Sequence, residues 1–288
     1  MRKSKRKVLF KIFSTLFIVY TLICTLLFFI QQRFLFIPTY NFQKTPDFYK
    51  INYKNVYLPV PKNLGGGEIH GWWIPVKKSN LGTLLYLHGR GLNIGSNINQ
   101  AYRFQQLGFS VLLIDYRGYG KSKGNFPTES QLYQDAEIAW NYLVNQQKIP
   151  ADRIFIYGHS LGGAVAIELA TKHPEAAGLI VQNSFTSMAN TIARYPYFRI
   201  FPISLILTHR FDSINKVKSL RIPVLFVHGV DDPLIPYTMS EKLYKAAPDP
   251  KQLLLISGAK HNNGDLFFNK IQYRTAIKNF ANSSLNKR

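Results

Sequence analysis

The sequence contains few cysteine residues and few acidic residues. Its 288 residues include one cysteine, Cys24, so no disulfide can form within the chain. Asp and Glu number 15 against 36 Lys and Arg, which gives a formal net charge of +21. Such an excess of positive charge favours anionic lipid headgroups, anionic polymers or nucleic acid as partners. The alternative is that a high isoelectric point is common to the proteins of the source organism.

Several other features are absent. The sequence contains no zinc-finger spacing and no RNA-recognition signature, so nucleic acid is a disfavoured partner. The 7 histidines show no spacing typical of metal ligands, and we therefore expect no metal. Hydrophobic residues make up 46% of the chain, which is enough for a substantial core and argues against global disorder.

One long apolar run lies near the N-terminus. As a helix, residues 8–30 (VLFKIFSTLFIVYTLICTLLFFI) are long enough to cross a hydrocarbon core of about 30 Å. The alternative is a cleaved signal peptide. The run exceeds the roughly 7–15 residues usual for one, and the bulky FFIQQRFLFIP stands where small residues would mark cleavage. We therefore predict a transmembrane anchor at 8–30 and a connecting segment at 31–51.

The basic sequence MRKSKRK before this run predicts an orientation. Positively charged flanks resist translocation, so residues 1–7 are expected to form a cytoplasmic tail. The next basic residues, Arg33, Lys44 and Lys50, are sparse. The prediction is a single-pass membrane protein whose globular part lies on the non-cytoplasmic side.

From residue 52 to residue 288, short apolar runs alternate with helical patterns. NVYLPV and EIHGWWIPV predict an antiparallel strand pair, and six more strands are predicted at TLLYLHG, FSVLLIDYRG, RIFIYG, AGLIVQN, IPVLFVHG and KQLLLISG. Helices are predicted near 98–107 and at TESQLYQDAEIAWNYLVNQQ, with Thr128 as a helix cap. This alternation predicts one α/β domain at 52–288, with a mostly parallel eight-stranded sheet and helices on both faces.

The residues of chemical interest follow the predicted strands, where sheets of this kind bind ligands. GHSLGG places Ser160 on a sharp turn between a strand and a helix. A serine hydroxyl becomes a nucleophile when a base takes its proton and a third group orients that base. Asp231 and Asp232 follow a later strand, and His261 follows the last one. The chain therefore offers a nucleophile, an acid and a base in the order Ser, Asp, His.

At these residues the sequence resembles the α/β-hydrolase superfamily. LHGRG, DYRGYGKSKG, GHSLGG, HGVDDPLIP and GAKHNN occur in family order, and the resemblance covers about residues 52–282. It is nearest to membrane-anchored hydrolases with a domain like that of prolyl oligopeptidase or serine aminopeptidase. The resemblance implies an α/β-hydrolase fold without a cofactor, with Ser160 as nucleophile, His261 as base and Asp232 as acid. Asp231 is the alternative acid.

The resemblance also implies an oxyanion hole and a cap. The backbone N–H groups of Leu161 and Arg90 are expected to hold the oxyanion. Relatives often carry a small or amide residue in place of Arg90, whose guanidinium could instead meet an anionic substrate group. Residues 184–221 form a longer stretch where family members commonly carry a cap, and an ordinary helix packed on the core is the alternative.

These features predict a membrane-anchored serine hydrolase. It is expected to cleave carboxylic esters or thioesters of small-molecule or lipid-like acyl substrates through an acyl-enzyme on Ser160. One alternative is an aminopeptidase or amidase with the same three residues. The other is a non-catalytic envelope interaction protein that retains the fold.

Overall fold

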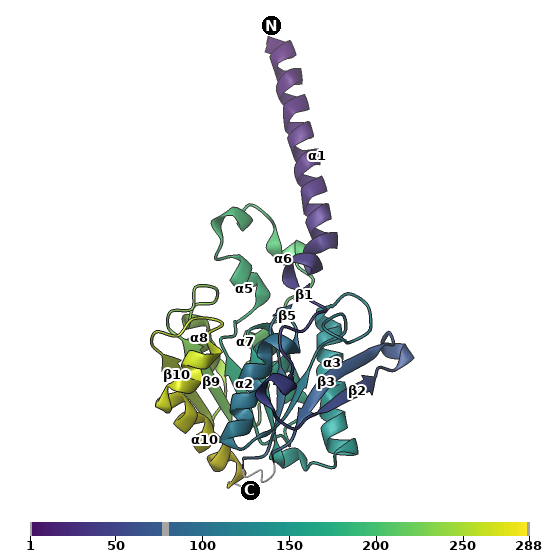
Figure 1. Ribbon diagram of the computed structural model, residues 1–288. Helices are drawn as coiled ribbons and strands as arrows, with labels where there is room; N and C mark the ends of the chain where they lie inside the picture. Colours follow the sequence, from purple (N-terminus) through teal and green to yellow (C-terminus); the bar gives the residue numbers. More distant parts are fainter. Residues whose placement is uncertain (1, 77–80, 287–288) are drawn as a thin grey trace.

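An eight-stranded sheet forms the centre of the computed structural model, which describes residues 2–76 and 81–286 (Figure 1). In sheet order the strands are β10 (Lys251–Ile256), β9 (Val224–Gly229), β8 (Gly178–Gln182), β7 (Ile154–His159), β4 (Thr83–Leu87), β6 (Ser110–Ile114), β3 (Glu68–Ile74) and β2 (Lys54–Pro59). Six strands, from β10 to β6, run parallel, and β3 is antiparallel to both of its neighbours. The predicted mostly parallel sheet of eight strands is confirmed.

Helices cover both faces of the sheet, as predicted (Figure 1). One face carries α2 (Ile94–Leu107), α9 (Gly264–Asn269) and α10 (Ile271–Leu285), and the other carries α3 (Glu129–Asn141), α4 (Leu161–Lys172), α7 (Ser213–Lys216) and α8 (Thr238–Ala246). Ile154 and Ile156 of β7 pack on the second face, whereas Phe155 and Tyr157 pack on the first. Because both faces are buried, the strand sequence is apolar at successive positions.

Local capping sets where the helices begin. Thr128 precedes α3, and its side chain accepts a hydrogen bond from the Gln131 N–H, as the sequence predicts. Asn93 caps α2 in the same way by accepting from the Gly95 N–H. The second cap places the start of α2 at Ile94, four residues before the predicted start near 98.

The N-terminal helix α1 (Arg2–Leu35) projects away from the domain (Figure 1). Among the described helices it alone is long and apolar enough to cross a membrane, and a signal sequence would pass the same test. Its most apolar window has a mean hydropathy of 2.4 and is not buried by the rest of the chain. Beyond α1, the short strand β1 (Ile37–Pro38) pairs in parallel with β5 (Gly91–Leu92). The connecting segment is therefore hydrogen-bonded to the loop that follows β4.

The region after β8 is built from short helices rather than one long helix. It contains α5 (Met188–Ile192), a 3₁₀ turn (Pro196–Phe198) and α6 (Ile203–Ile206). We refer to residues 188–207 as the cap segment. In Figure 1 this segment rises above the carboxyl edge of the sheet, beside the domain end of α1.

Candidate active site

Ser160 lies on a strained turn between β7 and α4. Its backbone has φ 55° and ψ −119°, in a region that residues with a side chain rarely adopt. The turn is possible because Gly162 lies directly against the neighbouring strand: a Cβ there would stand 2.1 Å from the carbonyl oxygen of Leu87. The glycine after Ser160 therefore lets α4 begin close to β4, and the turn holds Ser160 above the carboxyl edge of the sheet.

Three of the predicted residues meet at this edge. The hydroxyl Oγ of Ser160 lies 2.9 Å from Nε2 of His261, and Nδ1 of His261 lies 2.6 Å from Oδ2 of Asp232. A carboxylate only accepts hydrogen bonds, so Nδ1 carries the proton and Nε2 is free to accept one from the serine. We call this arrangement the Ser160 relay. Asp231, the alternative acid, is exposed to solvent and is not part of the relay.

Asp232 is held as a carboxylate by the donors around it. Its Oδ1 accepts hydrogen bonds from the N–H groups of Leu234 and Ile235, and Nε2 of His228 lies 3.3 Å from its Oδ2. Burial alone would raise the pKa of Asp232, but His228, His261 and the backbone donors hold that pKa well below its usual range. Asp232 is therefore negatively charged at neutral pH and can orient the His261 ring.

Two side chains fix the backbone that carries His261. The carbonyl oxygen of His261 accepts hydrogen bonds from Nε2 of His159 at 3.0 Å and from Nδ2 of Asn183 at 2.8 Å. Burial, together with the adjacent His261, lowers the pKa of His159 to about 3. His159 is therefore neutral at ordinary pH. His159 precedes the serine and Asn183 follows β8, so the backbone of His261 is braced from the ends of β7 and β8.

The two residues expected to donate to the oxyanion, Leu161 and Arg90, line the same cavity as Ser160. Leu161 is the first residue of α4, so its N–H has no acceptor within the helix. Arg90 follows β4, and its carbonyl oxygen accepts from the Ile37 N–H at 2.9 Å and from the Tyr119 hydroxyl at 2.7 Å. The Arg90 guanidinium donates to the carbonyl of Phe34 at the end of α1. Its side chain thus contacts the N-terminal helix.

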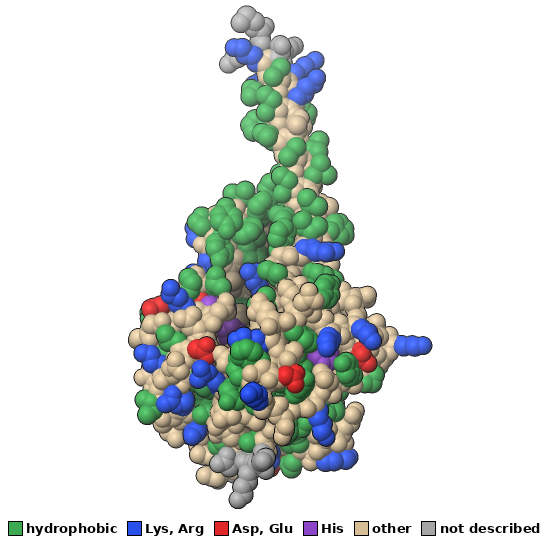
Figure 2. All heavy atoms as spheres, in the orientation of Figure 1, with side chains coloured by type: hydrophobic (Ala, Val, Ile, Leu, Met, Phe, Trp, Pro, Cys, Tyr) green, Lys and Arg blue, Asp and Glu red, His purple; other side chains and the backbone are tan. Residues whose placement is uncertain are grey.

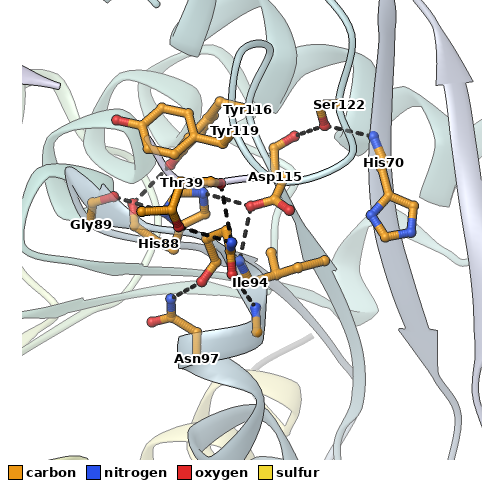
Figure 3. Close-up of polar contacts among 12 residues, drawn as sticks. Thr39, His70, His88, Gly89, Ile94, Asn97, Asp115, Tyr116, Tyr119 and Ser122 are labelled. Atoms are coloured by element: carbon orange, nitrogen blue, oxygen red, sulfur yellow. Dashed lines mark hydrogen bonds and ion pairs between the residues drawn. The ribbon is translucent and has the colours of Figure 1, made fainter. Parts of the chain in front are cut away.

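A second histidine and aspartate pair lies beneath this loop (Figure 3). Nε2 of His88 is 3.4 Å from Oδ1 of Asp115, and both side chains are fully buried. Nδ1 of His88 lies 2.7 Å from the carbonyl oxygen of Gly89, which only accepts, so Nδ1 carries a proton. Nε2 of His88 and the Asp115 carboxylate would then be two hydrogen-bond acceptors facing each other, unless one of the two groups carries a further proton. Burial raises the pKa of Asp115, which favours that proton.

This second pair supports the loop rather than the reaction. The Tyr116 hydroxyl donates to the carbonyl of His88, and the His88 ring packs against Tyr116 and Tyr119 (Figure 3). Nearby, Arg117 is buried in an ion pair with Asp135 at 2.7 Å. Asp115 and Arg117 are therefore buried structural residues and do not reach a substrate.

Ser160 and His261 border two cavities of different character. The polar cleft has a volume of about 1110 Å³ and is lined by many amide side chains, among them Asn97, Asn99, Gln100, Asn262 and Asn263. The apolar cavity has a volume of about 460 Å³ and lies between α1 and the cap segment. The nucleophile therefore stands at the junction of a polar and an apolar compartment.

Several of these side chains were not identified from the sequence. His159 and Asn183 were missed as braces for His261, although both lie at strand ends, which is a signal that could have found them. Gln31 and Phe34 border the apolar cavity from α1, and nothing local in an apolar helix marks them. Among the described residues, no three His, Cys, Asp or Glu side chains are grouped as metal ligands would be.

Comparison with known proteins identifies relatives along most of the chain. The family model described as serine aminopeptidase, S33, matches residues 78–209. A Mycobacterium tuberculosis protein, described as uncharacterized protein Rv2307c, is 36% identical over 223 residues, covering 77% of each chain. The human alpha/beta hydrolase domain-containing protein 17B is 30% identical over 207 residues, covering 70% of this chain and 67% of that protein.

Solved structures show the same fold. The esterase Pf2001 of Pyrococcus furiosus is 21% identical and superimposes with a TM-score of 0.69, covering 85% of this chain and 98% of that chain. At this identity the likeness concerns the fold alone. The expected α/β-hydrolase fold is confirmed by it.

Proposed function

Because the chain belongs to the α/β-hydrolase superfamily, we propose that it is a membrane-anchored serine hydrolase that cleaves carboxylic esters or thioesters. The observation that carries this proposal is the Ser160 relay, in which the serine hydroxyl, the His261 ring and the Asp232 carboxylate are joined by hydrogen bonds of 2.9 and 2.6 Å. The relay opens onto both cavities, so a bound ester can place its carbonyl at Ser160.

The reaction follows from the proton positions in the relay. Nε2 of His261 takes the Ser160 proton while Oγ bonds to the carbonyl carbon, and the carbonyl oxygen becomes an oxyanion. The N–H groups of Leu161 and Arg90 donate to this oxyanion. His261 then gives its proton to the departing alcohol or thiol, which leaves an acyl-enzyme. A water molecule repeats the sequence, with His261 as base, and releases the acid and the free serine.

The surroundings of the relay favour esters over substrates that carry a free amino terminus. Among the described residues that line the two cavities, Asp265 is the one carboxylate outside the relay, and Arg103 and Asn99 already bind it. A carboxylate is the strongest partner for a protonated amine, and the charge of Asp265 is already paired with Arg103. Comparing p-nitrophenyl esters with aminoacyl anilides measures this preference directly. Faster cleavage of the anilides would favour the aminopeptidase alternative.

The membrane part of the proposal rests on α1. Its exposed apolar side chains and its length suit a span of about 30 Å. With the basic N-terminal residues on the cytoplasmic side, the catalytic domain lies on the opposite side. A phosphatase reporter fused to the C-terminus, which is active only outside the cytoplasm, should be active. A reporter active only in the cytoplasm would refute this orientation.

Labelling with a fluorophosphonate probe tests serine catalysis. The wild type should be labelled and should hydrolyse p-nitrophenyl butyrate, and Ser160→Ala should lose both. Ser219→Ala, which removes an exposed serine hydroxyl away from the relay, should retain the label. Labelling that persists in Ser160→Ala contradicts the assignment of the nucleophile. A wild type that is neither labelled nor active supports the non-catalytic alternative.

A further inference from the structure

The end of α1 forms one wall of the apolar cavity. Leu27, Gln31, Phe34 and Leu35 line it from the helix, and residues of the cap segment such as Ile203 line the opposite side. Ser160 and His261 border the same cavity. The volume of about 460 Å³ lies in the range of about 300–1,000 Å³ usual for small-molecule sites. The apolar side of the candidate active site is thus completed by the helix that is proposed to cross the membrane.

Gln31 joins α1 to the cap segment. Its Nε2 donates to the carbonyl of Ile206 at 2.9 Å, and its Oε1 accepts from the Thr208 N–H at 2.9 Å. Gln31 is buried, so these bonds are shielded from solvent. A polar side chain buried in an otherwise apolar helix is costly unless it is hydrogen-bonded. Here the backbone of Ile206 in the cap segment and of Thr208 just after it supplies the partners. The helix and the cap segment are therefore fastened together.

A second contact places the cap segment at a defined height on α1. The Tyr20 hydroxyl donates to the carbonyl of Ile200 at 2.7 Å, and its ring stacks on Phe201 with centroids 6.1 Å apart. At about 1.5 Å per residue, Tyr20 lies about 15 Å along the helix from Ile30. That distance equals half of a hydrocarbon core of about 30 Å. If α1 spans the bilayer, the cap segment beside Tyr20 lies within one leaflet.

The outer surface of the cap segment suits that location. Tyr197, Ile200 and Leu205 are exposed by 63%, 68% and 78%, and none of them lines the cavity. Figure 2 shows hydrophobic side chains covering both α1 and the part of the molecule at its base. Such a continuous apolar surface marks a membrane or partner contact, and here it continues the surface of the anchor.

The two arginines of the cap segment are compatible with a membrane location. Arg194 donates to the carbonyl of Leu234 on the sheet domain, and Arg199 reaches back to the carbonyl of Ala193. Both guanidinium groups thus donate to backbone carbonyls. Charged side chains inside membranes are commonly paired with backbone carbonyls in this way.

We propose that the cap segment is immersed in the leaflet on the domain side, and that the apolar cavity receives the acyl chain of an ester lipid directly from that leaflet, between α1 and the cap. This inference rests on the proposed function and narrows its substrates to leaflet-resident acyl esters. The acyl chain occupies the apolar cavity, the carbonyl lies at Ser160, and the polar leaving group occupies the amide-lined cleft. His261 supplies the leaving-group proton as in the general reaction.

Fluorescence quenching tests the position of the cap segment. Leu205→Cys in a Cys24→Ser background carries an environment-sensitive fluorophore, and the full chain is placed in phosphatidylcholine vesicles. Doxyl-labelled lipids should quench this label, and aqueous iodide should not. Lys218→Cys, an exposed position on the sheet domain, provides the control and should show the reverse. Iodide quenching at position 205 would overturn the proposal. A label shielded from both quenchers would indicate a protein partner and would overturn it equally.

Activity tests the route of the substrate. The double variant Ile200→Asp and Leu205→Asp should hydrolyse vesicle-embedded 4-methylumbelliferyl oleate at least about tenfold more slowly than wild type. It should retain hydrolysis of soluble p-nitrophenyl acetate, because neither side chain lines the cavity. Phe48→Asp, at an exposed apolar position of the connecting segment, should affect neither substrate.

Two results separate this inference from the proposed function. If the wild type hydrolyses neither ester, the proposed function fails. If the wild type and the cap double variant hydrolyse both esters equally, the inference fails while the proposed function stands. A cavity-filling variant, Ile206→Trp, should in addition lower the ratio of kcat/KM for palmitoyl over butyryl p-nitrophenyl esters at least about tenfold. An unchanged ratio would show that the acyl chain does not occupy this cavity.

Discussion

The pair His261 and Asp232 and the pair His88 and Asp115 lie at the carboxyl edge of one sheet, and they differ in almost every other respect. His261 and Asp232 lie 2.6 Å apart, and the imidazole faces a serine hydroxyl that borders two cavities. His88 and Asp115 lie 3.4 Å apart in full burial, closed in by Tyr116 and Tyr119 (Figure 3). The same two residue types thus occur once at an open edge and once inside the protein.

The difference lies in which imidazole nitrogen is free. The Nδ1 proton of His261 is directed to the carboxylate, which leaves Nε2 available to the serine. The Nδ1 proton of His88 is directed to the Gly89 carbonyl instead, and its Nε2 faces Asp115. The first arrangement can move a proton to and from a reacting group, whereas the second can only hold a loop in place.

The largest expected effect comes from converting Asp232 to its amide. Asp232→Asn keeps the shape of the side chain but removes the acceptor that selects the reactive tautomer of His261, so kcat should fall about 10⁴-fold. Measurement of p-nitrophenyl butyrate hydrolysis checks this. Asp231→Asn changes the neighbouring exposed residue and should remain within about twofold of wild type. The opposite ranking of the two variants would identify Asp231 as the acid.

The sheet and the Ser160 relay were both predictable from the sequence, and for the same physical reason. Buried parallel strands appear in the sequence as apolar runs, and the residues after those runs meet at one edge. Ser160, His261 and the two candidates Asp231 and Asp232 could therefore be brought together without knowing the fold in detail, whereas the choice of Asp232 came from the family resemblance. The contacts of Gln31 with Ile206 and of Tyr20 with Ile200 span about 180 residues of sequence. No local pattern encodes such pairings, because they depend on how the cap segment packs against α1.

A glycine substitution should disrupt the buried pair and leave the relay residues in place. A Cβ at Gly120 would stand 1.9 Å from Oδ2 of Asp115, and the backbone there has φ +51°. Gly120→Ala should therefore destabilise the fold by about 1–3 kcal/mol or more, measured by thermal unfolding. Gly66→Ala is the matched control, since Gly66 has φ +65° with no atom within 4 Å of the added Cβ. Equal losses in the two variants would mean that contact with Asp115 contributes nothing.

The two aspartates should respond to acid in opposite directions. The pKa of Asp232 is lowered in the fold, so its contribution to stability is present above about pH 4 and is lost as the pH falls further. The pKa of Asp115 is raised by burial, so its contribution is present below about pH 4 and is lost as the pH rises through the raised value.

Asparagine variants make this difference measurable because asparagine does not titrate. The Tm of Asp232→Asn relative to wild type should become more negative as the pH rises toward about 4. The Tm of Asp115→Asn relative to wild type should become more positive as the pH rises above about 4. Thermal unfolding followed by circular dichroism in one detergent gives both series. Slopes of the same sign would show that the two carboxyl groups do not differ in the way the structure indicates.

The smallest expected effect concerns the link between the buried pair and the reaction. The Tyr119 hydroxyl donates to the carbonyl of Arg90, whose N–H is one of the proposed oxyanion donors. Tyr119→Phe removes that single hydrogen bond, worth about 0.5–1.5 kcal/mol, and should lower kcat by about two- to tenfold with KM nearly unchanged. Tyr133→Phe removes a hydroxyl that binds Glu129 away from the site and should not alter kcat. A fall in kcat for both variants would point to general destabilisation. A fall for Tyr119→Phe alone would show that the Tyr119 hydroxyl acts on the reaction through the position of the oxyanion loop.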